Sequence, residues 1–286
     1  MRAKLLKVAV AALTVTGLTI VTGPGASAAP SSGFNDWSCR PSAAHPEPVV
    51  MLHGLGGNGP GHFSFLGPFL AGAGYCAFAP TYGQADPNIP VGGTVSISKS
   101  GPEITAFIEK VRGTTGAAKV DLFGHSEGGF QSLWGPKILG YSAEVAKVVV
   151  LAPPTHGTTF GGLVSFGDAL GLRPLVDQIL NTFGCQFCDE AIVGAPVVAR
   201  LTTGPIAQPG IAYTIIASRA DALVTPTSTA FVREPGVHNS YVQDTCPFDQ
   251  VGHIGMAFDP GIATMIGNAL DPAHAKPVVC GFGPPF

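Results

Sequence analysis

A short apolar run followed directly by the pattern Gly-x-Ser-x-Gly constrains the fold of this chain more than any other feature. The run begins at Val120, and the pattern comprises Gly124, Ser126 and Gly128. A serine held at a sharp turn between a buried strand and a helix adopts a strained backbone, and small flanking residues let that turn close. The turn brings the serine hydroxyl and the first free amides of the helix to one spot. Because the chain contains 39 glycines, the pattern alone is weak, and the preceding strand is what favours a nucleophile elbow over an ordinary glycine-rich turn.

The first 28 residues have the pattern of a secretory signal peptide. Basic residues near the start precede an apolar run over 8–21, which is too short for a membrane span, and small residues up to Ala28 form a cleavage site. We therefore expect a secreted chain that begins near Ala29 and has no transmembrane segment. The remaining length suits one α/β domain with its own core, which we place over 29–286.

The six cysteines of an exported chain predict a disulfide framework. The sequence leaves the connectivity open, and we favour the pairs whose members lie in one region of the chain: Cys39–Cys76, Cys185–Cys188 and Cys246–Cys280. The alternative for the Cys-x-x-Cys pair is a redox or zinc site. It is disfavoured because no second pair of metal spacing and no strand-then-helix redox context accompany it.

Charge and composition argue against a nucleic-acid partner and favour an apolar substrate. The net charge is -3, only 12% of residues are charged, and no cluster of lysine or arginine could neutralise phosphates. We therefore expect no nucleic-acid binding. The 45% content of hydrophobic residues and the 26 prolines suit a compact exported protein with apolar surface available for a lipid-like substrate.

Apolar strands alternate with helical patterns along the mature chain. Strands are expected at 48–52, 75–79, 120–123, 145–151, 211–217 and 237–243, and helices at 61–73, at 101–111 with Pro102 at its start, and after the elbow to about 139. This alternation predicts a mostly parallel central sheet with helices on both faces. The segment from about 158 to 208 interrupts the alternation just past a strand end, where open α/β sheets bind ligands. We interpret it as a cap or lid insertion, and a packing excursion without a gating role is the alternative.

A serine nucleophile needs a base within hydrogen-bond reach and a carboxylate that orients the base. Of the eight histidines, His253 alone follows the last expected strand and precedes a helix, so it is the candidate base. Asp221 is the candidate carboxylate because it follows a buried strand and precedes a short rigid turn. Asp244 and Asp249 are alternatives that lie nearer to His253 in sequence. The chain order Ser126, Asp221, His253 is that of the α/β-hydrolases.

Two backbone amides are candidates for an oxyanion hole. The glycine-rich loop 53–57 follows a strand directly and can turn the amide of Leu55 toward a ligand, although an ordinary glycine turn explains the loop equally well. The amide of Glu127 is the first after Ser126. Because a carboxylate is unfavourable beside a developing negative charge, we expect the side chain of Glu127 to point away from the oxyanion and to pair with Arg219 or a hydroxyl.

Together these segments resemble the secreted triacylglycerol lipases and esterases of the class 2 lipase type, which are common in actinobacteria. The likeness rests on His53-Gly54-Leu55-Gly56, Gly124-His125-Ser126-Glu127-Gly128-Gly129, Thr155-His156-Gly157-Thr158, Asp221-Ala222-Leu223-Val224-Thr225-Pro226 and Gly252-His253-Ile254-Gly255. The resemblance implies an α/β-hydrolase fold and hydrolysis of acyl glycerols or simpler esters. It also implies Ser126, Asp221 and His253 as the triad and the amides of Leu55 and Glu127 as the oxyanion hole. Relatives often carry Gln or Met after the nucleophile, so Glu127 departs from the family pattern.

The function expected from the sequence is thus hydrolysis of lipid or other apolar esters, with contact to a lipid interface. An acyltransferase that uses the same triad with an alcohol acceptor is the alternative, and a lipid-binding protein with a vestigial site is a third. We expect a monomer without a cofactor. Some bacterial lipases hold calcium near the histidine loop, but Asp244, Asp249 and Asp259 form no dense cluster in sequence, so no metal is expected.

Overall fold

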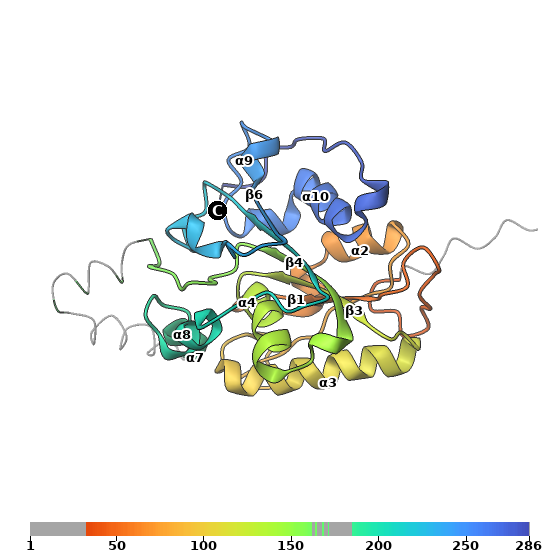
Figure 1. Cartoon of the computed structure of the whole chain (residues 1–286), viewed down its shortest axis with the longest axis horizontal. Helices are drawn as coiled ribbons and strands as arrows, with labels where there is room; N and C mark the ends of the chain where they lie inside the picture. Colours follow the sequence, from red (N-terminus) through yellow and green to blue (C-terminus); the bar gives the residue numbers. More distant parts are fainter. Residues whose placement is uncertain (1–32, 162–163, 165–167, 169–170, 172–184, 286) are drawn as a thin grey trace, which may run out of the picture. The chain divides into compact units, whose positions relative to one another are not determined.

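The structure is a computed structural model that describes residues 33–161, 164, 168, 171 and 185–285 (Figure 1). All of these residues belong to one unit of the chain, which spans 31–286. The expected signal peptide and the central part of the expected cap insertion lie outside the described residues, so both stay predictions.

A parallel sheet of six strands is the centre of the described fold, with the strand order β2-β1-β3-β4-β5-β6. The strands are β1 (Val49–Leu52), β2 (Ala77–Phe78), β3 (Val120–His125), β4 (Val145–Leu151), β5 (Ala212–Ala217) and β6 (Val237–Tyr241). Every residue of β1 and β3 is buried, as the near-continuous apolar runs of covered parallel strands require. The expected α/β-hydrolase sheet is confirmed.

Helices cover both faces of this sheet, with α3 and α4 on one face and α2 and α10 on the other (Figure 1). The α-helices are α1 (Gly59–His62), α2 (Leu66–Gly72), α3 (Ile97–Thr115), α4 (Glu127–Trp134), α7 (Gln186–Glu190), α8 (Pro196–Thr202), α9 (Val242–Thr245) and α10 (Pro260–Leu270). A π-helical turn, η1 (Gly135–Leu139), continues α4. Short 3₁₀ turns are η2 (Ser142–Glu144), η3 (Thr227–Ala230), η4 (Gly255–Phe258) and η5 (Pro272–His274).

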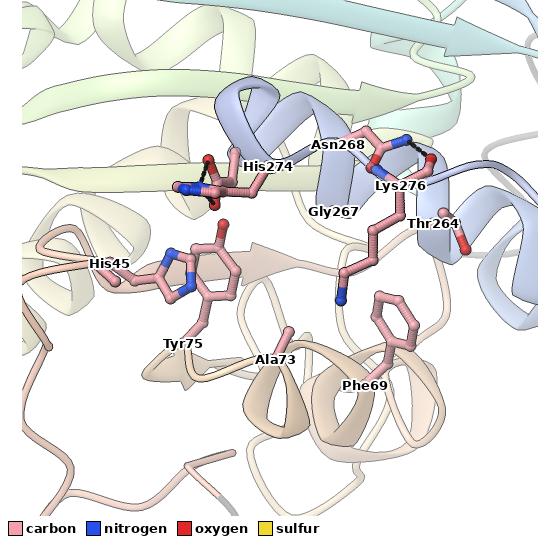
Figure 2. Close-up of a pocket in the computed structure, with 11 residues that line it drawn as sticks. His45, Phe69, Ala73, Tyr75, Thr264, Gly267, Asn268, His274 and Lys276 are labelled. Carbon is pink, nitrogen blue, oxygen red and sulfur yellow. Dashed lines mark hydrogen bonds and ion pairs between the residues drawn. The ribbon is translucent and has the colours of Figure 1, made fainter.

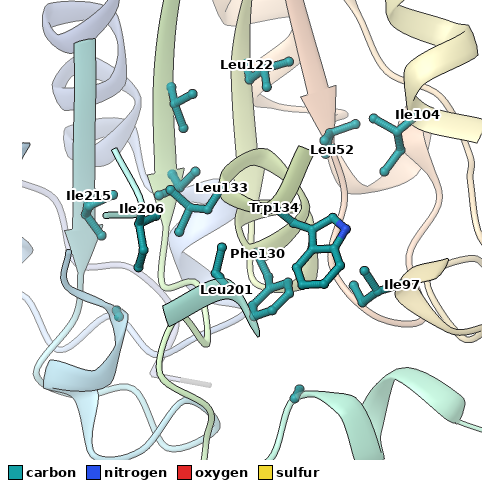
Figure 3. Packing of buried hydrophobic residues seen from close by; sticks show 14 of the residues in the cluster. Leu52, Ile97, Ile104, Leu122, Phe130, Leu133, Trp134, Leu201, Ile206 and Ile215 are labelled. Atoms are coloured by element: carbon teal, nitrogen blue, oxygen red, sulfur yellow. The ribbon is translucent and has the colours of Figure 1, made fainter. Parts of the chain in front are cut away.

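Successive residues of the strands β1 to β5 contribute to two separate hydrophobic cores, because strand side chains alternate between the faces of a sheet. Leu122 of β3 packs in the core that contains Ile104 of α3 and Leu133 of α4 (Figure 3). The next residue, Phe123, packs in the opposite core with Ile266 of α10. All five are at most 1% exposed, and full burial of such a side chain stabilises the fold by about 1.5–3 kcal/mol.

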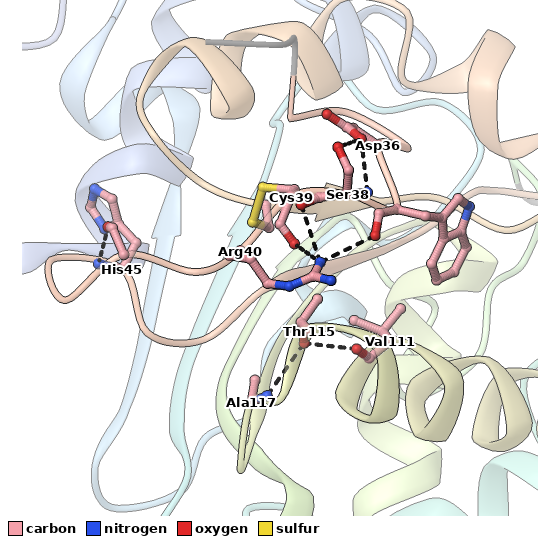
Figure 4. Close-up of a disulfide and its surroundings, with 11 residues drawn as sticks. Asp36, Ser38, Cys39, Arg40, His45, Val111, Thr115 and Ala117 are labelled. Carbon is pink, nitrogen blue, oxygen red and sulfur yellow. Dashed lines mark hydrogen bonds between the residues drawn. A yellow bond between two sulfur atoms is a disulfide. The ribbon is translucent and has the colours of Figure 1, made fainter.

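Three disulfides fasten the peripheral segments, and they join the cysteine pairs favoured from the sequence. Cys39–Cys76 ties the segment before β1 to the residue before β2, and Arg40 beside it donates to three neighbouring backbone carbonyls (Figure 4). Another disulfide closes the turn at the start of α7, and the third ties the end of α9 to the C-terminal segment. None of the six cysteines, all of which the structure describes, is free. This pattern is consistent with a secreted protein.

Two helix predictions were wrong in their boundaries. The helix expected over 61–73 is divided into α1 and α2. Helix α3 begins at Ile97, so Pro102 lies inside it rather than at its start. Contacts from α7 support the earlier start, since carboxylate oxygen Oε2 of Glu190 accepts a hydrogen bond of 2.6 Å from the amide of Ile97.

Candidate active site

Ser126 lies at the sharp turn between β3 and α4, in a backbone conformation that side chains rarely adopt. Its φ is 57° and its ψ is -119°, and its amide donates a hydrogen bond of 2.9 Å to the carbonyl of Leu151 at the end of β4. A Cβ atom on Gly124 would collide with the backbone of Gly128, and one on Gly128 would collide with the carbonyl of Leu52. Both glycines of the pattern are therefore required by the close approach of main chains, as expected of a nucleophile elbow.

Asp221 and His253 meet above the same edge of the sheet. The ring nitrogen Nδ1 of His253 lies 2.7 Å from Oδ2 of Asp221. The other carboxylate oxygen, Oδ1, accepts hydrogen bonds from the amides of Leu223 at 2.7 Å and Val224 at 2.9 Å. Asp221 is only 6% exposed and His253 only 4%. Because both carboxylate oxygens are bound and Nδ1 is occupied, Nε2 is the ring nitrogen left to act as a base.

The loop that carries His253 is held on both sides. The Ser218 hydroxyl donates a hydrogen bond of 2.5 Å to the carbonyl of Val251, and the amide of Gly252 donates one of 2.8 Å to the carbonyl of Pro284. The disulfide between Cys246 and the C-terminal segment fastens the start of the same loop. A base held in this way can keep a fixed distance from a nucleophile at the end of β3.

A pocket of about 150 Å³ brings Ser126 and His253 together with the loop that carries Leu55. Ser126 and His253 line it beside Leu55 and His62. Its other walls are mostly apolar and include Phe160, Phe187, Ala191, Leu223, Val224 and Ile254. Phe187 and Ala191 belong to α7 and the residue after it, within the segment expected to be a cap. The pocket thus offers a hydroxyl and an imidazole at one end of an apolar cavity.

The amides of Leu55 and Glu127 flank this site. Leu55 lies in the loop after β1, and Glu127 is the first residue of α4, where N–H groups have no partner within the helix. Among the described loops and turns, neither N–H donates a hydrogen bond to a backbone carbonyl. The arrangement leaves two donors for a negatively charged oxygen near Ser126.

The side chain of Glu127 lies away from the pocket, in the protein interior. It is fully buried and does not line the pocket, and neither carboxyl oxygen has a well-aligned hydrogen bond within the described part of the chain. A Cβ atom on Gly93 would touch Oε2 of Glu127, so the carboxyl packs against the backbone of that loop. Burial raises the pKa of Glu127 well above its usual value, and the nearby side chain of Gln131 opposes this shift only in part. Burial therefore favours the protonated, neutral form of this carboxyl.

Pairing of Glu127 with Arg219 is a prediction that was wrong. Arg219 is half-exposed and instead contacts Asp244 at 2.5 Å and stacks over the ring of Tyr241. The guanidinium already has a carboxylate and an aromatic partner at the surface. Burying it beside Glu127 would cost free energy, because the charged group would lose its hydration.

The aspartates near the histidine loop have structural contacts. Asp244 caps α9 and pairs with Arg219, Asp249 accepts a hydrogen bond from the amide of Val251, and Asp259 caps α10. Among the described residues, no group of three or more His, Cys, Asp or Glu side chains could hold a metal ion. Asp244 and Asp249, the alternative carboxylates, form no hydrogen bond with His253 within the described part of the chain.

A larger cavity, of about 440 Å³, lies elsewhere in the fold (Figure 2). It is lined by Tyr75, which precedes β2, and by side chains of α2, α10 and the segment after α10, including Phe69, Asn268 and Lys276. Tyr75 precedes its strand, whereas Ser126 follows its own, so this cavity lies toward the opposite edge of the parallel sheet. No serine or cysteine is among the described residues that line it, and volume alone therefore does not identify the reactive site.

The parallel sheet, the elbow and the Asp–His pair define an α/β-hydrolase type of protein. Residues 49–272 match the Alpha/beta hydrolase family, and the chain belongs to this family. Over 114 residues it is 29% identical to a triacylglycerol lipase of Pseudarthrobacter phenanthrenivorans and to one of Burkholderia plantarii. These matches cover 38% of this chain and 34% and 31% of the two relatives, so the chain matches only about a third of their length.

Two solved structures share the fold at low sequence identity. Lipase B of Aspergillus fumigatus superposes with a TM-score of 0.61 at 16% identity, over 84% of this chain and 56% of that one. A serine hydrolase from Cycloclasticus zankles superposes with a TM-score of 0.53 at 16% identity, over 80% and 92% of the two chains. In the part of the chain that the structure describes, no helix is both long and apolar enough to cross a membrane.

Proposed function

We propose that the protein is a secreted serine hydrolase that cleaves lipid or other apolar esters, as a lipase or esterase. The observation that carries this proposal is the hydrogen bond between Asp221 and His253 at a pocket that Ser126 also lines. The names of the bacterial relatives, both triacylglycerol lipases, support the same reaction class.

The proposed reaction proceeds through an acyl-enzyme. Oγ of Ser126 attacks the ester carbonyl carbon while Nε2 of His253 takes the hydroxyl proton, and Asp221 stabilises the imidazolium that forms. The amides of Leu55 and Glu127 donate to the oxyanion, a contribution of about a hundredfold to a thousandfold in turnover for each donor. The imidazolium then protonates the leaving alkoxide. A water molecule, deprotonated by His253, attacks the acyl-enzyme and releases the carboxylic acid and Ser126.

The surroundings of the pocket support an apolar ester as the substrate. Phe160, Phe187 and Val224 offer an apolar wall for an acyl chain, and no Asp, Glu, Lys or Arg is among the described residues that line the pocket. Leu55, Leu223 and Ile254 line the pocket and are also exposed to solvent. Exposed apolar side chains grouped at one opening favour contact with a lipid surface.

The decisive experiment compares initial rates on p-nitrophenyl esters of short to long acyl chains, below and above their aggregation point. Ser126→Ala should abolish hydrolysis, whereas Ser132→Ala, a matched change of a second serine nearby in α4, should keep it. A rate increase above the aggregation point with long chains identifies a lipase, and a short-chain preference without it identifies an esterase. Activity that survives in Ser126→Ala refutes the mechanism. A dominant transfer to an added alcohol would instead identify an acyltransferase.

We further propose that residues 1–28 are removed on export and that 29–286 acts as a monomeric single domain with a cap over about 158–208. The disulfides support an oxidising destination. N-terminal sequencing of the exported protein tests the cleavage site, and light scattering tests the monomer.

A further inference from the structure

A row of hydrogen-bonded imidazoles connects the pocket wall to the backbone of the candidate base. His62, the last residue of α1, lines the pocket, and its Nε2 lies 2.8 Å from Nδ1 of His125. His125, the last residue of β3, places its own Nε2 2.9 Å from the backbone carbonyl oxygen of His253. The ring centroids are 5.0 Å apart for the first pair and 4.8 Å for His125 and His253. The residue before Ser126 is thus bonded directly to the residue that carries the base.

The acceptors in this row determine which nitrogen of each neutral ring carries the proton. A carbonyl oxygen can only accept, so Nε2 of His125 must be the donor to His253. In a neutral His125 the other nitrogen, Nδ1, is then an acceptor, and Nε2 of His62 must donate to it. Both rings therefore carry their proton on Nε2, while His253 carries its own on Nδ1 toward Asp221.

Burial keeps the two rings neutral. Burial and, to a smaller extent, the charges of the neighbouring histidines together lower the pKa of His62 to about 3 and the pKa of His125 well below its usual value. The rings of His53 and His253 face the row, His53 beside His62 and His253 beside His125. A positive charge on either of them would repel a positive charge on the row, so neither favours protonation of His62 or His125. A neutral row does not oppose the positive charge that His253 gains during the proposed reaction.

We propose that His125, held in turn by His62, is a positioning residue that sets the separation between the Ser126 hydroxyl and the imidazole of His253. This inference rests on the proposed ester hydrolysis. His125 and Ser126 are consecutive, and the acceptor is the backbone of His253 itself, so this hydrogen bond links the segment that carries the hydroxyl to the residue that carries the imidazole. A displacement of about 1 Å between reacting groups can cost about a hundredfold in rate.

The test uses the steady-state kinetics of His125→Phe, which keeps a ring and removes both hydrogen bonds. We expect kcat to fall by about 10-fold to 100-fold with KM within about twofold of wild type, because geometry of the transition state is lost and binding is kept. His125→Gln, which keeps a donor nitrogen near the ε position, should recover much of kcat. His62→Phe should lower kcat less, and it keeps the test usable if His125→Phe does not fold.

His156→Phe is the matched control, because it removes a histidine whose Nε2 also bonds a backbone carbonyl, that of Phe231 at 3.0 Å, but which does not line the pocket. A wild-type kcat in both His125→Phe and His62→Phe would refute the positioning role alone. An equal loss of kcat in His156→Phe, or no recovery of kcat in His125→Gln, would mean that the loss reflects lower stability of the protein. Either result would also refute the positioning role. A wild-type protein that neither hydrolyses esters nor reacts with a phosphonate would refute the proposed function instead.

Nitrogen-15 NMR of the imidazoles tests the row without any activity. The expected result is a proton on Nε2 in His62 and His125, and on Nδ1 in His253. His53 provides an internal standard with its proton on Nδ1, because this nitrogen lies 2.8 Å from the carbonyl oxygen of Gly54, which can only accept a hydrogen bond. A proton on Nδ1 of His125 would overturn the inferred hydrogen-bond order and the proposal with it.

Discussion

Replacing the buried acid after the nucleophile, Glu127→Gln, should stabilise the protein by an amount that grows with pH. In the unfolded chain this carboxyl ionises above its usual pKa of 4.5, whereas burial keeps it protonated to a higher pH in the folded protein. Between those two pKa values the folded state binds one more proton than the unfolded state. The free energy of unfolding therefore falls as pH rises through this range, and the loss begins at the unfolded-state pKa.

The magnitude follows from the same linkage. One proton corresponds to about 1.4 kcal/mol for each pH unit, so each pH unit inside this range costs the wild type about 1.4 kcal/mol that the glutamine variant keeps. The buried histidines contribute an opposite slope below about pH 6.5, because burial lowers the pKa of His53 to about 4 and that of His62 to about 3. That slope is common to both proteins and cancels in their difference.

Urea unfolding of both proteins at a series of pH values from about 5 to about 8 measures this difference. Glu109→Gln, at an exposed position of α3, is the matched control for loss of a surface carboxylate. Parallel stability curves for wild type and Glu127→Gln would refute the reasoning, since they would mean that the carboxyl ionises as readily in the folded protein as in the unfolded chain.

Three further changes have expected outcomes. Asp221→Asn should lower kcat by about a thousandfold or more because the base loses its orienting carboxylate, whereas Asp244→Asn should leave kcat unchanged. A similar loss of kcat in both variants would contradict the assignment of Asp221 as the carboxylate that orients His253. Gly128→Ala should prevent folding or destabilise the protein by more than about 4 kcal/mol, while Gly56→Ala, with a φ of +73° and open space around it, should cost only about 1–2 kcal/mol in thermal unfolding. Replacing both cysteines of the Cys246–Cys280 disulfide, which are 34 residues apart, with serine should cost about 4 kcal/mol on the chain-entropy model, and an unchanged unfolding midpoint would contradict it.

Residues at strand ends were the most predictable part of the site. Asp221 and His253 are 32 residues apart and form the expected contact because β5 and β6 are parallel and adjacent, so the segments after both strands meet at one edge. Their catalytic roles stay predictions. The run at 145–151, which is apolar except for Lys147, likewise matches β4 residue for residue, because a short run of this kind between polar flanks suits a covered strand.

Contacts between distant segments were not predictable. The ring of His62 reaches His125 across 63 residues of sequence, and no local pattern marks a histidine at the end of a short helix as a partner of the elbow. The same reason explains why Arg219 was assigned the wrong carboxylate and why α3 starts early, where Glu190 of α7 accepts from Ile97. Local patterns fix periodicity and turns, whereas these contacts depend on how completed elements pack.

The strained backbone at Ser126 sets the stability of the fold against the proposed catalytic activity at residue 126. Its conformation is one that glycine adopts far more easily, and such strain is worth about 1–3 kcal/mol. Selection or design for heat resistance alone would therefore favour glycine at the very position where the proposed reaction needs a hydroxyl. A screen of this protein that scores only survival on heating should enrich inactive chains, and it needs a parallel selection for turnover to keep the serine.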